Sequence, residues 1–467
     1  MATTARPGPP DGGPSTSRSS RKRPSSAGPS TNRASEPGLT LADAPPRLLG
    51  LGDQVALWGN LGVSLLLPVT ATFILTPPAA TEPMALGAAL LAILVGALIG
   101  NLLLGLSARA GAETGVPAMV MLRGLLGRRA SYVPTVLNVA QCVGWAVFEI
   151  VIIAEAAARL TDDDLRPLYV VLAGVVATAM AVRPLGSVRT LKRVAVWLVL
   201  ASTVYLFVQV LREPRPGLGD GSWDGFWQSA DLVIALSVSW IPLSADYSRH
   251  SRRPGDAFWG AFIGYGLAGS AFFTLGVLAL VGFALEPGFD VIDALLSVPV
   301  GGLALLILLV DEVDEAFANV YSTAVSVQNV APKLDRRTLA VGVGIVATLA
   351  ALAFDVVEYE AFLFVIGSVF VPLFATFAAA YYVLDRGRWD VSADAPSRPA
   401  MLLPWAAGFV TYQLISPPSV AAWQRFWLDR QADLGFVPPG WLSASLASFA
   451  VAALLTLVIG KATARRT

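Results

Sequence analysis

Residues 301–332 have the composition of a membrane-spanning helix that carries a cluster of acids. The first ten residues of this stretch are almost purely apolar, and the next five positions include four acids: Asp311, Glu312, Asp314 and Glu315. No Lys or Arg lies within the stretch to neutralise them. An ionised carboxylate at mid-membrane costs at least ~2.5 kcal/mol on insertion scales, so such residues usually face a bundle interior or a wet cavity. The stretch therefore predicts a functional site.

A helix over this stretch would gather polar side chains on one face. At 100° per residue, this face contains Asp311, Asp314, Glu315, Ala318 and Ser322. Glu312 and Asn319 lie together on its flank. We expect this face to hold protons or a cation beside a polar ligand, and a Na⁺ near Asp314 is one alternative. Another alternative is that the acids lie in solvent at the outer end of the helix. That helix would have only ten apolar residues, whereas a span needs ~20.

The composition of the whole chain is that of a polytopic, all-α membrane protein. Of its 467 residues, 55% are hydrophobic and 14% are charged, whereas soluble domains carry about 25% charged residues. Because its net charge is zero, the chain has no general electrostatic attraction to nucleic acid. We expect membrane lipid to surround it. Cys142 and His250 are the only residues of their types, which excludes an intrachain disulfide, a Cys-based zinc site and a His-cluster metal site. A Ser-His-Asp triad would have to use His250.

Twelve apolar segments are expected to cross the membrane. They lie at 53–76, 84–108, 131–159, 167–184, 190–211, 229–248, 257–285, 300–331, 338–355, 360–384, 400–417 and 441–460. With the N-terminus inside, the inner loops hold 17 Lys and Arg residues and the outer loops hold 6. Because positive charge accumulates on the cytoplasmic side, we predict a multi-pass protein of the cell membrane with both termini in the cytoplasm. Residues 1–45, rich in Pro, Ser and Gly, are expected to be a disordered cytoplasmic tail.

Spans 1 and 6 are interrupted by residues that weaken a helix. These residues are Gly59, Asn60, Gly62, Ser64 and Pro68 in span 1, and Ser237, Ser239, Trp240, Pro242 and Ser244 in span 6. Paired interruptions in corresponding spans point to an inverted-repeat transporter site, although small residues also serve close helix packing. Gly62 is a candidate substrate contact and Val63 a candidate contact of the coupling ion. In span 7, Gly260 and Gly264 form a GxxxG that suits either a dimer contact or close packing, so the oligomeric state is left open.

Span 3 combines an aromatic ring and an acid on one helical face. Gln141, Trp145 and Glu149 follow one another at intervals of four residues. This arrangement suits a flat ligand, because the ring of Trp145 can stack on it while Glu149 accepts hydrogen bonds from its N–H groups. The alternative is a core Trp beside a Glu that bonds to a neighbouring helix. Glu155 lies to one side and is expected to be a gate residue or purely structural.

Three segments give the chain a resemblance to a known family. They are Trp240–Arg249 (WIPLSADYSR) with Phe258–Tyr265 (FWGAFIGY), the Gly144–Trp145 pair, and the span 8 positions Asp311, Val313, Phe317, Tyr321, Ser322, Val325, Ser326, Asn329, Pro332, Lys333 and Leu334. Here the chain resembles the nucleobase:cation symporter-1 family, nearest to its purine-cytosine and hydroxymethylpyrimidine permease branch. The resemblance covers roughly residues 45–390.

The resemblance implies a leucine-transporter-like fold with two inverted repeats of five helices and two further C-terminal helices. The corresponding segments would be 46–212, 229–384 and 400–467. It also implies import of a purine, pyrimidine, hydantoin, allantoin or vitamin precursor, driven by Na⁺ or H⁺, with no other cofactor. By resemblance, Trp145 would stack on the base, Glu149 would stand where some members have a substrate-binding Gln, and Asn319 would bind the substrate. Ser237 to Trp240 would supply the contact from span 6.

The chain departs from sodium-coupled members of that family in span 8. Those members place Ser or Thr hydroxyls where this chain has Val313 and Asp314. Asp311, Glu312, Asp314 and Glu315 cannot all be ionised together without a cation, so they are the candidates for ion coupling, with H⁺ favoured over Na⁺. The leading hypothesis is a secondary transporter for a nucleobase-like heterocycle. The alternatives are an amino-acid or other small-metabolite carrier of the same fold and, more remotely, a membrane enzyme.

The predicted topology can be tested with a single engineered cysteine. In a Cys142→Ser background, Gly219→Cys should react with a membrane-impermeant maleimide added to intact cells, because the loop 212–228 is expected outside, as is the loop 418–440. Reaction of Gly219→Cys only from the cytoplasmic side would contradict this topology.

Overall fold

The computed structural model describes residues 40–464, except for 42, 44, 78, 79, 81, 162, 286–289 and 354–358. For residues 163, 185–195, 463 and 464 the backbone alone is described. Within these residues the regular elements are helices, and two isolated bridges are the only extended pairings.

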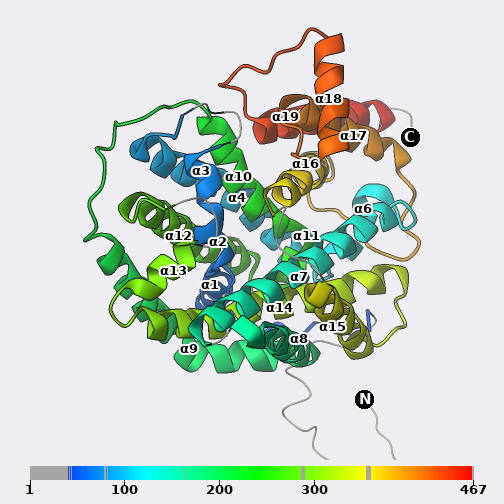
Figure 1. Cartoon of the computed structure of the whole chain (residues 1–467). Helices are drawn as coiled ribbons and strands as arrows, with labels where there is room; N and C mark the ends of the chain where they lie inside the picture. The colour runs from blue at the N-terminus through cyan, green and yellow to red at the C-terminus, as the bar shows by residue number, and fades with distance from the viewer. Residues whose placement is uncertain are drawn as a thin grey trace, which may run out of the picture. The chain divides into compact units, whose positions relative to one another are not determined.

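The helices follow one another along the chain as shown in Figure 1. Their bounds are α1 Leu51–Asn60, α2 Leu66–Thr70, α3 Thr72–Leu75, α4 Leu86–Thr114, α5 Ala118–Met121, α6 Arg123–Leu126, α7 Tyr132–Leu160, η1 Asp163–Leu165, α8 Arg166–Val182, α9 Pro184–Val210, α10 Phe226–Ser239, α11 Ile241–Ser248, α12 Pro254–Gly282, α13 Asp290–Ser297, α14 Gly301–Val330, α15 Arg336–Ala353, α16 Tyr359–Ala378, η2 Ala379–Leu384, η3 Pro399–Met401, α17 Leu402–Ile415, α18 Ala421–Asp433 and α19 Ala444–Ala464.

Spans 1 and 6 are divided, as their sequences predict. The first helix of span 1 ends at Asn60 and the next begins at Leu66, while α10 and α11 meet at Trp240. Pro68 lies in the first turn of α2. A backbone N–H at this position would have no carbonyl acceptor within the helix, so a proline costs no helical hydrogen bond here. Seven helical segments in the described part of the chain are long and apolar enough to cross a membrane.

The central helix is α14, which packs against α7, α8, α9 and α15 and runs beside α7 in Figure 1. It continues without a break from Gly301 to Val330. Its four acids are at most 5% exposed. The alternative in which these acids lie in solvent at the end of a short helix is therefore wrong.

The two glycines of the GxxxG pair bring α12 close to α1. A Cβ added at Gly264 would lie 2.6 Å from the carbonyl oxygen of Val55, and one added at Gly260 would lie 2.2 Å from Cβ of Gln54. Only glycine permits this approach. The pair therefore packs inside the bundle, which is one of the two roles that the sequence left open.

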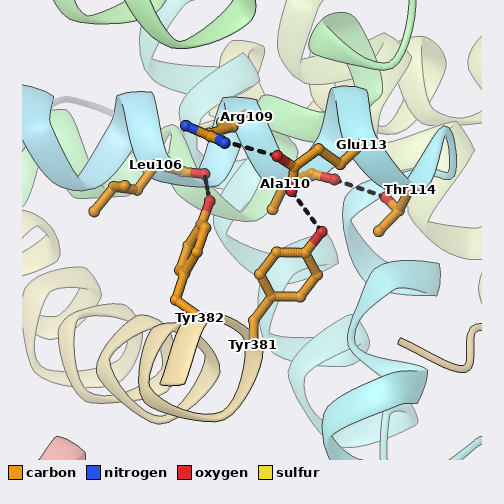
Figure 2. A network of polar contacts seen from close by, with 7 residues as sticks. All are labelled: Leu106, Arg109, Ala110, Glu113, Thr114, Tyr381 and Tyr382. Atoms are coloured by element: carbon orange, nitrogen blue, oxygen red, sulfur yellow. Dashed lines mark hydrogen bonds and ion pairs between the residues drawn. The ribbon is translucent and has the colours of Figure 1, made fainter. Parts of the chain in front are cut away.

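A polar network joins the end of span 10 to α4 (Figure 2). The π-helical turn η2 carries two consecutive tyrosines. Tyr381 donates to Oε2 of Glu113 at 2.8 Å, and Tyr382 donates to the carbonyl oxygen of Leu106 at 2.7 Å. Glu113 also pairs with Arg109 at 2.8 Å. These contacts fix the ends of α4 and α16 to one another.

Candidate functional site

One carboxylate from α14 holds the break between α1 and α2. The Ser64 hydroxyl donates to Oε1 of Glu312 at 2.8 Å, and the Leu65 N–H donates to Oε2 at 2.8 Å. The Ser64 oxygen in turn accepts from the N–H of Leu66 at 3.1 Å. Glu312, which is 0% exposed, thereby satisfies donors that the broken helix leaves without acceptors.

A second pair of acids lies at the end of α1. The Asn60 side chain donates from Nδ2 to Oδ2 of Asp314 at 2.6 Å. Both carboxylate oxygens of Asp311 are buried without a hydrogen-bond partner among the described residues. The acids of α14 therefore form two groups. Asp314 bonds to Asn60 at the end of α1 and lies near Asp311, whereas Glu312 and Glu315 lie close to Glu149 of α7.

Glu149, Glu312 and Glu315 form a cluster that we call the carboxyl triad. One carboxylate oxygen from each lies within 4.8 Å of the others, and the side chains are 1%, 0% and 5% exposed, respectively. No ion pair found among the described residues includes any of the three. Ionised carboxylates this close in a low dielectric repel one another strongly. The triad must therefore hold protons or a cation, and its oxygens would suit a hard metal ion.

A small cavity borders the triad. Five residues predicted for the site from the sequence line it together: Trp145, Glu149, Trp240, Glu315 and Asn319. The other lining residues are Ser64, Leu66, Leu67, Leu236, Ser239, Leu243, Tyr265 and Tyr359. The structure thus brings together residues from α2, α7, α10, α11, α12, α14 and α16, together with the break in span 1. Their roles in binding remain predictions.

Aromatic rings form much of the cavity wall. Trp145 packs edge to face against Tyr359 and Phe362, with ring centroids 5.6 and 5.3 Å away. Nε1 of Trp240 donates to the Tyr265 hydroxyl at 2.9 Å, whereas Nε1 of Trp145 has no acceptor among the described residues. Rigid rings with one donor left over suit a flat ligand that carries a hydrogen-bond acceptor.

Four other residues predicted for the site do not line this cavity. Gln141 donates to a backbone carbonyl of α10 at 2.8 Å, and Ser237 donates to a carbonyl of its own helix at 3.3 Å. Gly62 lies against α12, where an added Cβ would be 2.9 Å from the nearest side-chain atom. Val63 is 7% exposed within the break of span 1. In this structure these residues support the walls around the cavity.

Two features of the site were not apparent from the sequence. Tyr359 begins α16, and no motif or spacing singles it out, because it reaches the cavity only through the packing of α16. The link from Ser64 to Glu312 joins two residues that the sequence singles out separately, as an interruption of span 1 and as an acid of span 8. A shortage of acceptors at the break is the signal that could have suggested a partner from another helix.

In sequence, the chain is similar to known permeases. The profile of the family described as "Permease for cytosine/purines, uracil, thiamine, allantoin" matches residues 70–162 and 165–400. The chain is also 24% identical over 344 residues to "Putative purine-cytosine permease YxlA" of Bacillus subtilis (strain 168), a match that covers 67% of this chain and 73% of that protein.

In fold, the chain is similar to solved membrane transporters. Mhp1, a nucleobase-cation-symport-1 family transporter in a closed conformation with bromovinylhydantoin bound, is 17% identical with a TM-score of 0.69, over 90% of this chain and 99% of that one. A Na⁺-coupled sialic acid symporter is 12% identical with a TM-score of 0.61, over 91% and 92% of the two chains. A manganese transporter of Eremococcus coleocola is 13% identical with a TM-score of 0.57, over 92% and 100%. These similarities show a helical, multi-pass membrane transporter fold.

Replacing Glu312 tests whether its carboxylate holds the break. Glu312→Ala should lower the melting temperature in detergent, because each buried donor left without an acceptor costs about 1–3 kcal/mol. Glu312→Gln keeps one of the two acceptor oxygens, so it should lower the melting temperature less than Glu312→Ala does. Equal melting temperatures for the two variants would contradict this role.

Proposed function

The chain belongs to the family of permeases for cytosine/purines, uracil, thiamine and allantoin, and on this premise we propose that it imports a nucleobase or related N-heterocycle by cation symport. Cytosine, a purine or a hydroxymethylpyrimidine-like molecule are the candidate substrates. The observation that carries the proposal is the cavity that Trp145, Glu149 and Asn319 line together. The family and the fold are those of a transporter and not of an enzyme. An amino-acid or other small-metabolite carrier of the same fold is the alternative.

The cavity offers complementary groups for a flat heterocycle. The rings of Trp145 and Trp240 provide stacking surfaces, while Glu149 and Asn319 provide hydrogen bonds for the polar edge of the ligand. Gln141, Ser237 and Gly62 would contact the ligand when the cavity enlarges during alternating access. Transport then consists of binding from one side, closure of the cavity and opening to the other side.

In this proposal, the coupling ion compensates the negative charge of the buried carboxyl groups. Asp311, Asp314 and the carboxyl triad together place five carboxyl groups inside the bundle, each at most 5% exposed. We assign H⁺ over Na⁺, because Val313 and Asp314 stand where sodium-coupled relatives are expected to have hydroxyls. Asp314, bonded to Asn60 at the break, is the proposed proton carrier. A Na⁺ near Asp314, with a carbonyl oxygen from the Val63 region, is the alternative.

We also propose the full architecture. Residues 46–212 and 229–384 form two inverted repeats of five spans, residues 400–467 add two spans, and both termini are cytoplasmic. The divided helices of spans 1 and 6 support this arrangement, since they open the two halves. The predicted tail at residues 1–45 falls almost wholly outside the described residues.

Removing the ring of Trp145 tests the stacking role. Trp145→Ala should weaken binding of the transported heterocycle by ~1–3 kcal/mol, the range found for stacking of a base on an aromatic side chain, and Trp145→Phe should lose less. Trp197→Ala on α9 is the matched control, because Trp197 is 69% exposed and is not among the cavity-lining residues. Unchanged binding in Trp145→Ala would exclude this role.

Uptake into proteoliposomes under one gradient at a time tests symport and identifies the ion. With radiolabelled cytosine, adenine and hydroxymethylpyrimidine as candidates, an inward pH gradient without Na⁺ should drive accumulation of the substrate. Asp314→Asn should still exchange substrate but fail to concentrate it, because the neutral amide cannot carry the proton. Accumulation driven by Na⁺ alone and insensitive to a protonophore would overturn the assignment of H⁺. Absence of uptake under every gradient would contradict the transporter proposal.

A further inference from the structure

The cavity presents buried polar atoms that have no partner. Oε2 of Glu149 and Oε1 of Glu315 belong to cavity-lining residues and accept no hydrogen bond from a described donor. Nε1 of Trp145, whose side chain is 5% exposed, lacks an acceptor in the same cavity. Buried polar groups are rarely left unpaired in native proteins. Two acceptors and one donor, on three residues that line one cavity, therefore suit the polar edge of a ligand.

The members of the carboxyl triad are not equivalent. Glu312 accepts one hydrogen bond on each of its oxygens from the break in span 1, and donated hydrogen bonds favour the ionised form of a carboxyl group. Glu149 and Glu315 have free oxygens instead. Of the three side chains, Glu312 therefore has the contacts that best stabilise an ionised carboxylate, and we place the proton that the triad needs between Glu149 and Glu315.

We infer that the ligand has a basic ring nitrogen next to an exocyclic amino group and is bound as its protonated cation between Glu149 and Glu315. This rests on the proposed function and narrows its substrate class. The protonated ring N–H and one amino N–H donate in parallel to the two oxygens of Glu149, in the two-point pairing that carboxylates form with planar donors. The second amino N–H is left for Glu315.

The binding step neither takes up nor releases a proton. The proton held between Glu149 and Glu315 moves to the ring nitrogen as the neutral heterocycle enters. Glu149 becomes ionised and the ligand becomes cationic, so the net charge in the cavity is unchanged. Nε1 of Trp145 remains available for an acceptor on the ligand, such as a second ring nitrogen or a carbonyl oxygen.

The same chemistry selects against oxo heterocycles. A ring N–H beside a carbonyl group offers one donor and one acceptor along that edge, and the edge has no basic nitrogen to take the proton. Its carbonyl oxygen would face an ionised carboxylate, or the triad would have to keep its proton on Glu149. Sites built for N–H groups discriminate strongly against analogues that leave buried polar atoms unpaired.

Binding of matched amino and oxo heterocycles to the purified full chain tests the inference. Cytosine and uracil form one pair, adenine and hypoxanthine the other, and the members of each pair have nearly the same shape. If the chain binds pyrimidines, cytosine should bind at least ~10-fold more tightly than uracil. If it binds purines, adenine should exceed hypoxanthine by the same factor, because the oxo compound loses a charge-assisted hydrogen bond. If the pyrimidines fit, 5-fluorocytosine should bind more weakly than cytosine, because fluorine lowers the basicity of the ring nitrogen with little change in size.

Glu149→Gln supplies the decisive variant. Its amide has one donor and one acceptor and suits both members of a pair, so the preference should fall to less than ~3-fold, within the energy of one neutral hydrogen bond. Glu155→Gln is the matched control on the same helix, because Glu155 pairs with Arg159 and Arg166 and is not among the cavity-lining residues. It should retain the full preference.

The alternative outcomes are distinguishable. Equal affinities within a pair, tighter binding of the oxo member, or an unchanged preference in Glu149→Gln would overturn the inference and leave the transporter function intact. Stabilisation by Mn²⁺ without any heterocycle, abolished in Glu149→Gln, would identify the triad as a metal site and also overturn it. If none of the heterocycles binds the folded wild-type chain, the proposed function falls together with the inference.

Discussion

The hydrogen bonds from the break in span 1 to Glu312 are the interaction on which the rest of the site depends. A broken helix inside a membrane leaves N–H groups that must find acceptors within the protein. The Ser64 hydroxyl and the Leu65 N–H find them in one carboxylate from α14. This contact fixes the break against the central helix and at the same time holds a buried carboxyl group in place. The cavity lies directly beside this junction, since Ser64 also lines it.

Burying so many acids makes positive charge a requirement for the folded protein. The carboxyl triad and the Asp311–Asp314 pair have no described ion-pair partner, so protons, a metal ion or a cationic ligand must compensate them. The two groups contact different parts of the protein, because Asp314 bonds to Asn60 at the end of α1 whereas the triad includes Glu149 of α7. In the proposed function, this division lets neighbouring but different acids bind the substrate and the coupling ion.

The sequence predicts those parts of the site that depend on one helix. Trp145 and Glu149 share a face because both lie on α7, and the acids of α14 are buried because the helix extends far beyond them. Helical periodicity places Asp314 and Glu315 on one face, yet the structure directs them to different neighbours. That separation depends on where α1 and α7 pack around α14, which the spacing of one helix cannot specify. For the same reason, Gln141 and Ser237 could not be distinguished as ligand contacts or as supports of the backbone. Helix ends differ from the predicted spans by a few residues, as at α4, which continues to Thr114, because helices extend past the apolar segment.

A structure of the full chain determined with its transported heterocycle bound would test the central claim most directly. The account predicts ligand density against the ring of Trp145, with the polar edge of the ligand within hydrogen-bonding distance of the Glu149 carboxylate and with Glu312 still bonded to Ser64 and Leu65. Density elsewhere in the bundle, with the carboxyl triad arranged as it is here, would contradict it.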